Sequence, residues 1–199
     1  MNSLAQVIAA VSTPPGKGGV AIIRMSGNGA FEIAEKAFKP ISGKKISAYR
    51  PRTQIYGHII YNEEKIDDVL LTLFPAPHSY TGEDTVEICC HGGVLVTRTV
   101  LEALLRAGAM PATAGEFTRR AFLNGQMDLT QAEAVIDLID AETAAAARNA
   151  AAQLDGGLRR ALTPIQDALL EITSRFYAVV DYPDEDIEDI HPEQIAASL

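Results

Sequence analysis

Apolar and polar residues alternate through much of the first half of the chain, a pattern that predicts β-strands. Strands are expected at residues 5–12, 20–25, 53–61, 66–74 and 85–91, the third and fourth forming a hairpin. Apolar residues three or four positions apart predict helices at residues 28–38 and 94–105. Strands mixed with two helices predict an α+β, or mixed α/β, domain.

Beyond Gly115 the apolar spacing is helical throughout. A short helix is expected at residues 116–123. The next begins at Asp128 or Thr130, because either side chain can cap it, and Thr130 with Glu133 matches a capping box. This part of the chain therefore predicts an all-α region.

The helical pattern continues to the end of the chain. Helices are expected at residues 141–152, which are rich in alanine, and at 154–180, with breaks near Gly156 and Pro164. The last ten residues begin another helical pattern and stop, which predicts a fragment of a longer protein. Two domains are expected, at residues 1–120 and 121–199, the second being only the first part of a helical domain.

The strand at residues 85–91 carries the most suggestive polar residues. Glu87 and His91 share the face opposite its apolar side chains, and Gly92-Gly93 follow before a helix. Glycines between a strand and a helix let backbone N–H groups approach a ligand closely. Glu87 is therefore either a solvated strand residue or a bidentate acceptor for an amino-pyrimidine, and His91 is expected to be structural or supporting.

A glycine-rich loop at residues 13–19 contains Lys17, Gly18 and Gly19. It lacks the Gly-Lys-Ser/Thr ending of a phosphate loop, and it leads into a strand, which excludes a dinucleotide fingerprint. It is either a tight turn or a backbone cradle for a ligand. Arg24, at the end of the following strand, either reaches solvent or provides a donor fork for a carboxylate.

Charge and cysteine content narrow the class of protein. The net charge is −9, and seven acids fall between Asp181 and Glu193; without them 19 acids face 17 bases. This balance argues against a free-standing nucleic-acid-binding protein. The adjacent Cys89 and Cys90 cannot easily bridge each other or form a zinc site alone. With no membrane-spanning run and no basic leader, a cytoplasmic protein with no membrane association is expected.

Four stretches together resemble the tRNA modification GTPase family MnmE, also called TrmE. They lie at residues 13–27, 79–93, 115–124 and 127–134. The resemblance implies a domain like the tetrahydrofolate-binding domain of the glycine-cleavage aminomethyltransferase, followed by part of a helical domain. In the family a Ras-like G domain is inserted into the helical domain, and no phosphate-loop motif occurs in this chain.

The resemblance also implies a function. Family members bind a reduced folate, 5-formyl- or 5,10-methylene-tetrahydrofolate, as the one-carbon donor, and they form homodimers. With the FAD-dependent partner MnmG (GidA), they modify the wobble uridine of certain tRNAs, using GTP, Mg²⁺ and K⁺. The present chain, without the G domain, is expected not to be catalytic alone.

Carried over by motif, the folate contacts fall on Arg24, Glu87 and Gln126. Arg24 would donate to a polar or anionic part of the folate, and Glu87 would accept from the pterin. The family usually has lysine at the third position, so Gln126 keeps a donor but loses a charge. The possible supporting residues are Lys17, Gly18, Gly19, His91, Gly92, Gly93 and Arg120.

Two alternatives remain open at this point. One is a purely structural dimerisation module that has lost folate binding, which the departure at Gln126 allows. The other is a stand-alone folate-dependent enzyme like an aminomethyltransferase, which would need a catalytic acid or base beside the folate.

Overall fold

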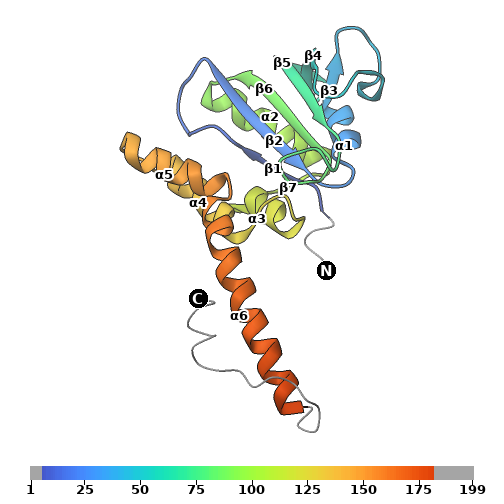
Figure 1. Cartoon of the computed structure of the whole chain (residues 1–199). Helices are drawn as coiled ribbons and strands as arrows, with labels where there is room; N and C mark the ends of the chain where they lie inside the picture. The colour runs from blue at the N-terminus through green and yellow to red at the C-terminus, as the bar shows by residue number, and fades with distance from the viewer. Residues whose placement is uncertain (1–5, 182–199) are drawn as a thin grey trace. The chain divides into compact units, whose positions relative to one another are not determined.

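The structure is a computed structural model that describes residues 6–181 (Figure 1). The chain divides by its contacts into two compact units, Met1–Met127 and Asp128–Leu199. The boundary expected at residue 120 falls inside helix α3 (Glu116–Leu123), whose Arg120 is buried in the first unit. The helical pattern expected for the last ten residues lies outside the described residues.

From residue 6 onward, the first unit is built on one seven-stranded sheet. The strands are β1 (Ile8–Val11), β2 (Val20–Ser26), β3 (Phe38–Pro40), β4 (Gln54–Tyr61), β5 (Glu64–Phe74), β6 (Thr85–His91) and β7 (Met110–Pro111). Their order is β3-β4-β5-β6-β2-β1-β7. Every neighbouring pair is antiparallel except β1 and β7. The mixed α/β fold and the hairpin of β4 and β5 are confirmed.

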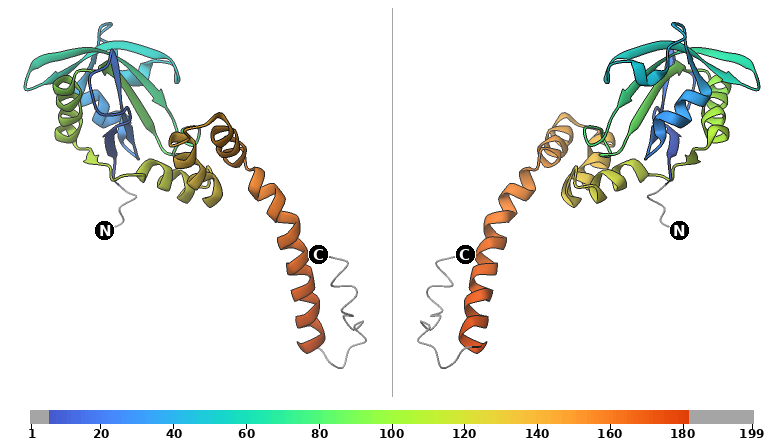
Figure 2. Two further views of the ribbon diagram at one scale, coloured as in Figure 1. Left: turned by 90° about the vertical axis from the view of Figure 1, so that its left-hand side faces the viewer. Right: turned by 90° about the vertical axis from the view of Figure 1, so that its right-hand side faces the viewer.

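Two helices, α1 (Ala30–Ala37) and α2 (Val94–Ala107), pack beside each other on one face of this sheet (Figure 2). The strand residues on that face, such as Ile23, Val86 and Ile88, are fully buried. The alternate residues of the same strands face the other side, here called the open face. This alternation separates the core from the polar residues predicted to bind a ligand.

Up to residue 181, the second unit contains three helices, α4 (Leu129–Ile139), α5 (Ala144–Leu154) and α6 (Gly157–Asp181). A capping box begins α4, but it pairs Asp128 with Gln131, so the pairing expected for Thr130 with Glu133 is wrong. The Thr130 hydroxyl instead donates to the Asp128 carboxylate. Hydrogen bonds from the Gln131 backbone and then from Thr130 lower the pKa of Asp128.

The break expected at Gly156 is confirmed, but the one expected at Pro164 is wrong, because α6 runs through that proline. A proline loses its own hydrogen bond to the carbonyl four residues earlier and its ring crowds that carbonyl, but α6 continues through it for 25 residues in all. No helix in the part of the chain that the structure describes combines the length and apolar character needed to cross a membrane.

Candidate ligand site on the open face of the sheet

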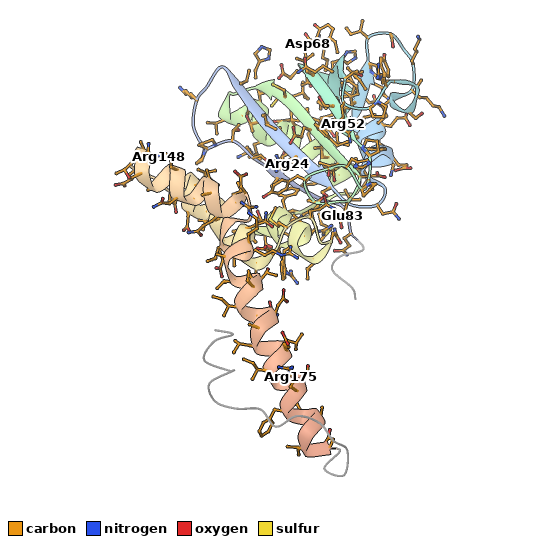
Figure 3. The ribbon with its side chains drawn as sticks, in the orientation of Figure 1. Arg24, Arg52, Asp68, Glu83, Arg148 and Arg175 are labelled. Carbon is orange, nitrogen blue, oxygen red and sulfur yellow. The ribbon has the colours of Figure 1, made fainter. Side chains whose placement is uncertain are left out.

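Arg24 and Glu87 lie directly opposite each other on β2 and β6 (Figure 3 labels Arg24). The Arg24 Nε donates to Glu87 Oε1 at 2.9 Å, and Nη2 lies 2.8 Å from the same oxygen. Their side chains are 25% and 29% exposed, so the pair is open to solvent on one side. Within the described residues, Glu87 Oε2 accepts no hydrogen bond, which leaves this oxygen available to a ligand.

Two aromatic rings hold the Arg24 guanidinium. Its Cζ lies 5.0 Å from the centre of the Tyr80 ring and 5.6 Å from that of Phe117, within the range of cation–π attraction. The Tyr80 hydroxyl is hydrogen-bonded to Thr118 at 2.9 Å, which links the loop before β6 to α3. The cation is therefore positioned by three separate parts of the chain.

Gln126 lies against the same loop. A Cβ placed on Gly82 would be only 2.9 Å from Gln126 Nε2, and Gly82 has a φ of +76°, so the loop needs glycine there. Beside it, Asn124 Nδ2 donates to the Thr81 carbonyl at 2.7 Å. The structure thus brings Gln126 to the loop that carries Tyr80.

A buried polar network fixes this loop to α3. Arg120 is 1% exposed and binds Glu83 Oε2 and Glu116 Oε1, each at 3.1 Å. Its Nη1 also donates to the Gln6 carbonyl at 2.9 Å, and the Ser26 hydroxyl donates to Glu83 at 2.9 Å (Figure 3 labels Glu83). Arg120, one of the possible supporting residues, is therefore engaged by carboxylates inside the protein.

The charge of Arg120 also acts on its partner Glu116. Burial raises the pKa of Glu116, but hydrogen bonds from Thr113 and Arg120 outweigh burial and hold that pKa below its usual value. Glu116 therefore stays ionised and keeps the network intact at neutral pH.

The glycine-rich loop lies elsewhere. Lys17, Gly18 and Gly92 line a cleft of about 640 Å³ together with Ala21 and Leu101 of the helix-covered side. This cleft is lined by neither Arg24 nor Glu87, and β2 places Arg24 four residues, about 13 Å, beyond Val20 at the cleft. This cleft and the Arg24–Glu87 pair are therefore separate features.

Close backbone packing explains the glycines at this turn. Gly18 N donates to Gly92 O at 3.0 Å, and a Cβ on Gly92 would lie 2.7 Å from Gly18 O. Gly19 O accepts from Gly92 N at 3.4 Å, while Gly93 is the N-cap residue of α2. These contacts give the glycines a structural role in joining the loop to the end of β6.

His91 is also held by a neighbour. Its Nδ1 lies 2.6 Å from Asp67 Oδ1, and its backbone N–H donates to Asp67 Oδ2 at 2.8 Å. On the same face of β6, Cys89 lies between His91 and Glu87.

The neighbouring cysteine is not a reactive thiolate. Burial raises the pKa of Cys90 to about 11, so that thiol is protonated at neutral pH. Within residues 6–181 no cluster of His, Cys, Asp or Glu is arranged to hold a metal ion.

Sequence reasoning did not single out Tyr80, Phe117, Glu83 or Asn124. Tyr80 and Glu83 lie in the stretch 79–93, and Phe117 and Asn124 in the stretch 115–124, both of which carried the family resemblance. Which residues these four contact in space is set by the fold and could not be derived from the stretches alone. The available signals were their places in those stretches and, for Phe117, its position on the same helix as Arg120.

Comparison with known proteins places these features in a family. The model described as the N-terminus of the GTP-binding protein TrmE matches residues 7–126. The model of the MnmE helical domain matches residues 129–199. The two matches meet close to the boundary between the structural units.

Several similar curated proteins carry the name tRNA modification GTPase MnmE. The protein from Clostridioides difficile is 50% identical over 183 residues, covering 92% of this chain and 40% of the relative. Those from Chloroflexus aurantiacus and Symbiobacterium thermophilum are 49% and 46% identical over 193 residues, covering 96% of this chain and 41% and 42% of the relatives. The chain thus spans about two-fifths of the length of these relatives. It belongs to the MnmE (TrmE) family, and it matches the N-terminal and helical domains of that family.

Proposed function

We propose that the first unit binds a reduced folate and that the whole protein is a tRNA modification GTPase. The observation that carries the folate proposal is the partly exposed Arg24–Glu87 pair on the open face. The names of the relatives support the second part of the proposal.

The chemistry of the pair suits a pterin ring. The 2-amino-4-oxopyrimidine edge of a folate presents two parallel N–H donors, which a carboxylate accepts in a bidentate fashion. Glu87 Oε2 is unengaged within the described residues, whereas two Arg24 nitrogens approach Oε1, so the pterin would take Oε2 and share Oε1 with Arg24. Glu87 is therefore the proposed anchor, and Arg24 keeps its carboxylate oriented.

Arg24 and Gln126 have the remaining roles in the site. The Arg24 guanidinium, held by Tyr80 and Phe117, is the proposed donor to a polar or anionic part of the folate. Gln126 is the neutral donor at the position where the family usually has lysine. When bound, the folate supplies a one-carbon unit, and these side chains bind and orient it.

The remaining parts of the proposal come from family membership. The full-length protein would use GTP, Mg²⁺ and K⁺ through a G domain, and would modify the tRNA wobble uridine with the FAD-dependent partner MnmG. We place it in the cytoplasm as a homodimer.

Calorimetric titration of the chain with 5-formyl-tetrahydrofolate tests the folate proposal. Saturable binding with a stoichiometry near one per chain is expected. A folded dimer that binds no folate would overturn it in favour of the structural module.

A second assay separates binding from catalysis. With 5,10-methylene-tetrahydrofolate and a simple amine, the chain alone is expected to give no turnover, since Arg24 and Glu87 bind each other and no other acid or base is placed beside them by the described contacts. Catalysed aminomethyl transfer would instead favour the stand-alone enzyme.

A further inference from the structure

One edge of the sheet carries an unusual concentration of positive charge. Six of the 17 lysines and arginines of the chain fall within residues 36–52, and no acid occurs from residue 36 to residue 62. The six are Lys36, Lys39, Lys44, Lys45, Arg50 and Arg52, and all are exposed. The net charge of the chain is −9, so this cationic edge is a local exception.

The cationic edge is held in a fixed shape. The segment leaves α1, forms the edge strand β3 and returns through a short 3₁₀ turn, η2 (Ile46–Ala48), to β4. Ile46 is 1% exposed and anchors the turn in the core. Backbone bonds from Ile41 to Tyr56 and from Arg52 to Leu73 tie both sides of the loop to the sheet. The cations are therefore displayed on a scaffold that is already ordered.

None of these six cations forms a salt bridge with a described residue. Lys36 donates to the Ala107 carbonyl and Arg52 to the His78 carbonyl (Figure 3 labels Arg52). The adjacent acid Glu35 accepts from the Ile46 backbone N–H. Elsewhere Lys65 and Arg98 are among the cations with carboxylate partners, Asp68 and Glu102. Single cations such as Lys17 and Arg148 also lack a salt bridge with a described residue, but only the cationic edge gathers six of them. The charges of the cationic edge are thus left for an external anion.

We propose that the cationic edge binds the sugar-phosphate backbone of the tRNA substrate. This proposal rests on the proposed function in tRNA modification. Clustered lysines and arginines neutralise phosphates without reading sequence, and they position the RNA for chemistry elsewhere. The half-exposed Tyr56 ring on the adjoining strand offers a stacking surface for an unpaired base.

The composition of the surface favours RNA over an acidic protein. A protein interface has an apolar core. Across residues 36–58 the large apolar side chains that are exposed are Ile41 and Tyr56. A surface whose charged side chains are all cationic, with a single exposed aromatic ring beside them, suits a polyanion better than a protein interface.

The test is fluorescence anisotropy with a labelled tRNA transcript, from about 50 to 200 mM salt. The variant Lys44→Gln/Lys45→Gln/Arg50→Gln is compared with a control of equal charge change, Arg98→Gln/Arg148→Gln/Arg175→Gln, at exposed positions outside this edge. The first is expected to weaken binding at least tenfold and to reduce the slope of log Kd against log salt by about 2 to 3. The control is expected to stay near the parent chain.

Three results would overturn the proposal: no tRNA binding at low salt, equal losses in both triple variants, or competition by polyglutamate as strong as that by tRNA. The last would indicate an acidic protein partner. Folate titration of the same samples keeps the two proposals apart. Folate binding without RNA binding would reject only the cationic edge, whereas RNA binding without folate binding would reject only the folate site.

Discussion

Arg24 and Glu87 restrict each other because they face each other across two neighbouring strands. Glu87 holds the guanidinium at its edge, and the Tyr80 and Phe117 rings lie within cation–π distance. Because these contacts already fix the rotamers, a ligand meets groups whose side-chain entropy has been lost before binding.

Replacing Tyr80 by leucine should weaken folate binding by about 0.5–2 kcal/mol, the usual range of a cation–π contact, because Arg24 loses one of its rings. Calorimetry on the purified variant measures the effect. Tyr80→Phe is the matched control, since it keeps the ring and removes only the hydroxyl bond to Thr118. Equal losses of folate affinity in the two variants would show that the Tyr80 ring does not contribute to binding.

Arg120 should matter for stability. Arg120→Met leaves Glu83 and Glu116 without their shared cation, and removing one partner of a buried ion pair typically costs about 3–5 kcal/mol. Urea unfolding of the first unit measures the loss, with the exposed Arg119→Met as control. A loss no larger than that of the control would contradict the structural role of Arg120.

The lowered pKa of Glu116 predicts a pH dependence. Its contribution to stability is fully present above the ordinary pKa of a glutamate, about 4.3, and is lost as pH falls through the lower pKa of the folded state. The free energy of unfolding should therefore decline on acidification below that ordinary value. The free energy of unfolding of Glu116→Gln should decline less steeply over the same pH range. A pH profile identical to that of the parent chain would refute the contribution of ionised Glu116 to stability.

At the scale of elements, the long strands and helices were predictable because their burial follows their periodicity, as in β6 and α2. The strands β3 and β7, at two or three residues, are too short to show a period. The break expected at Pro164 was wrong because the preference of proline against helix interiors is a local one, and α6 continues through it. For the site, motif matching supplied Glu87 and Arg24, whereas Tyr80 meets Arg24 only through the fold.

Thr143 should be important to α5. Its hydroxyl accepts from the Ala146 N–H at 3.1 Å and caps the helix. Thr143→Ala should lower the stability of the second unit by about 1 kcal/mol, as measured by thermal unfolding followed by circular dichroism. Thr143→Ser keeps the cap and serves as the control; a Ser variant as unstable as the Ala variant would exclude capping as the cause.

At the scale of the whole molecule, the chain combines a folate-domain candidate with helices of a family whose curated relatives are more than twice its length. Its charge is divided unevenly, with six cations along one sheet edge and seven acids between Asp181 and Glu193. The proposed ligand site and the cationic edge use different residues, so folate affinity and RNA affinity should be separable by mutation.

The central claim is that the Glu87 carboxylate binds the amino-pyrimidine edge of folate. A double-mutant cycle tests it most directly, by titrating the parent chain and Glu87→Gln with 5-formyl-tetrahydrofolate and with an analogue carrying methyl in place of the 2-amino group. Each single change should weaken binding by about 1.5–3 kcal/mol, and the two together should cost little more than either alone. Additive losses, or an unchanged affinity in Glu87→Gln, would contradict the claim.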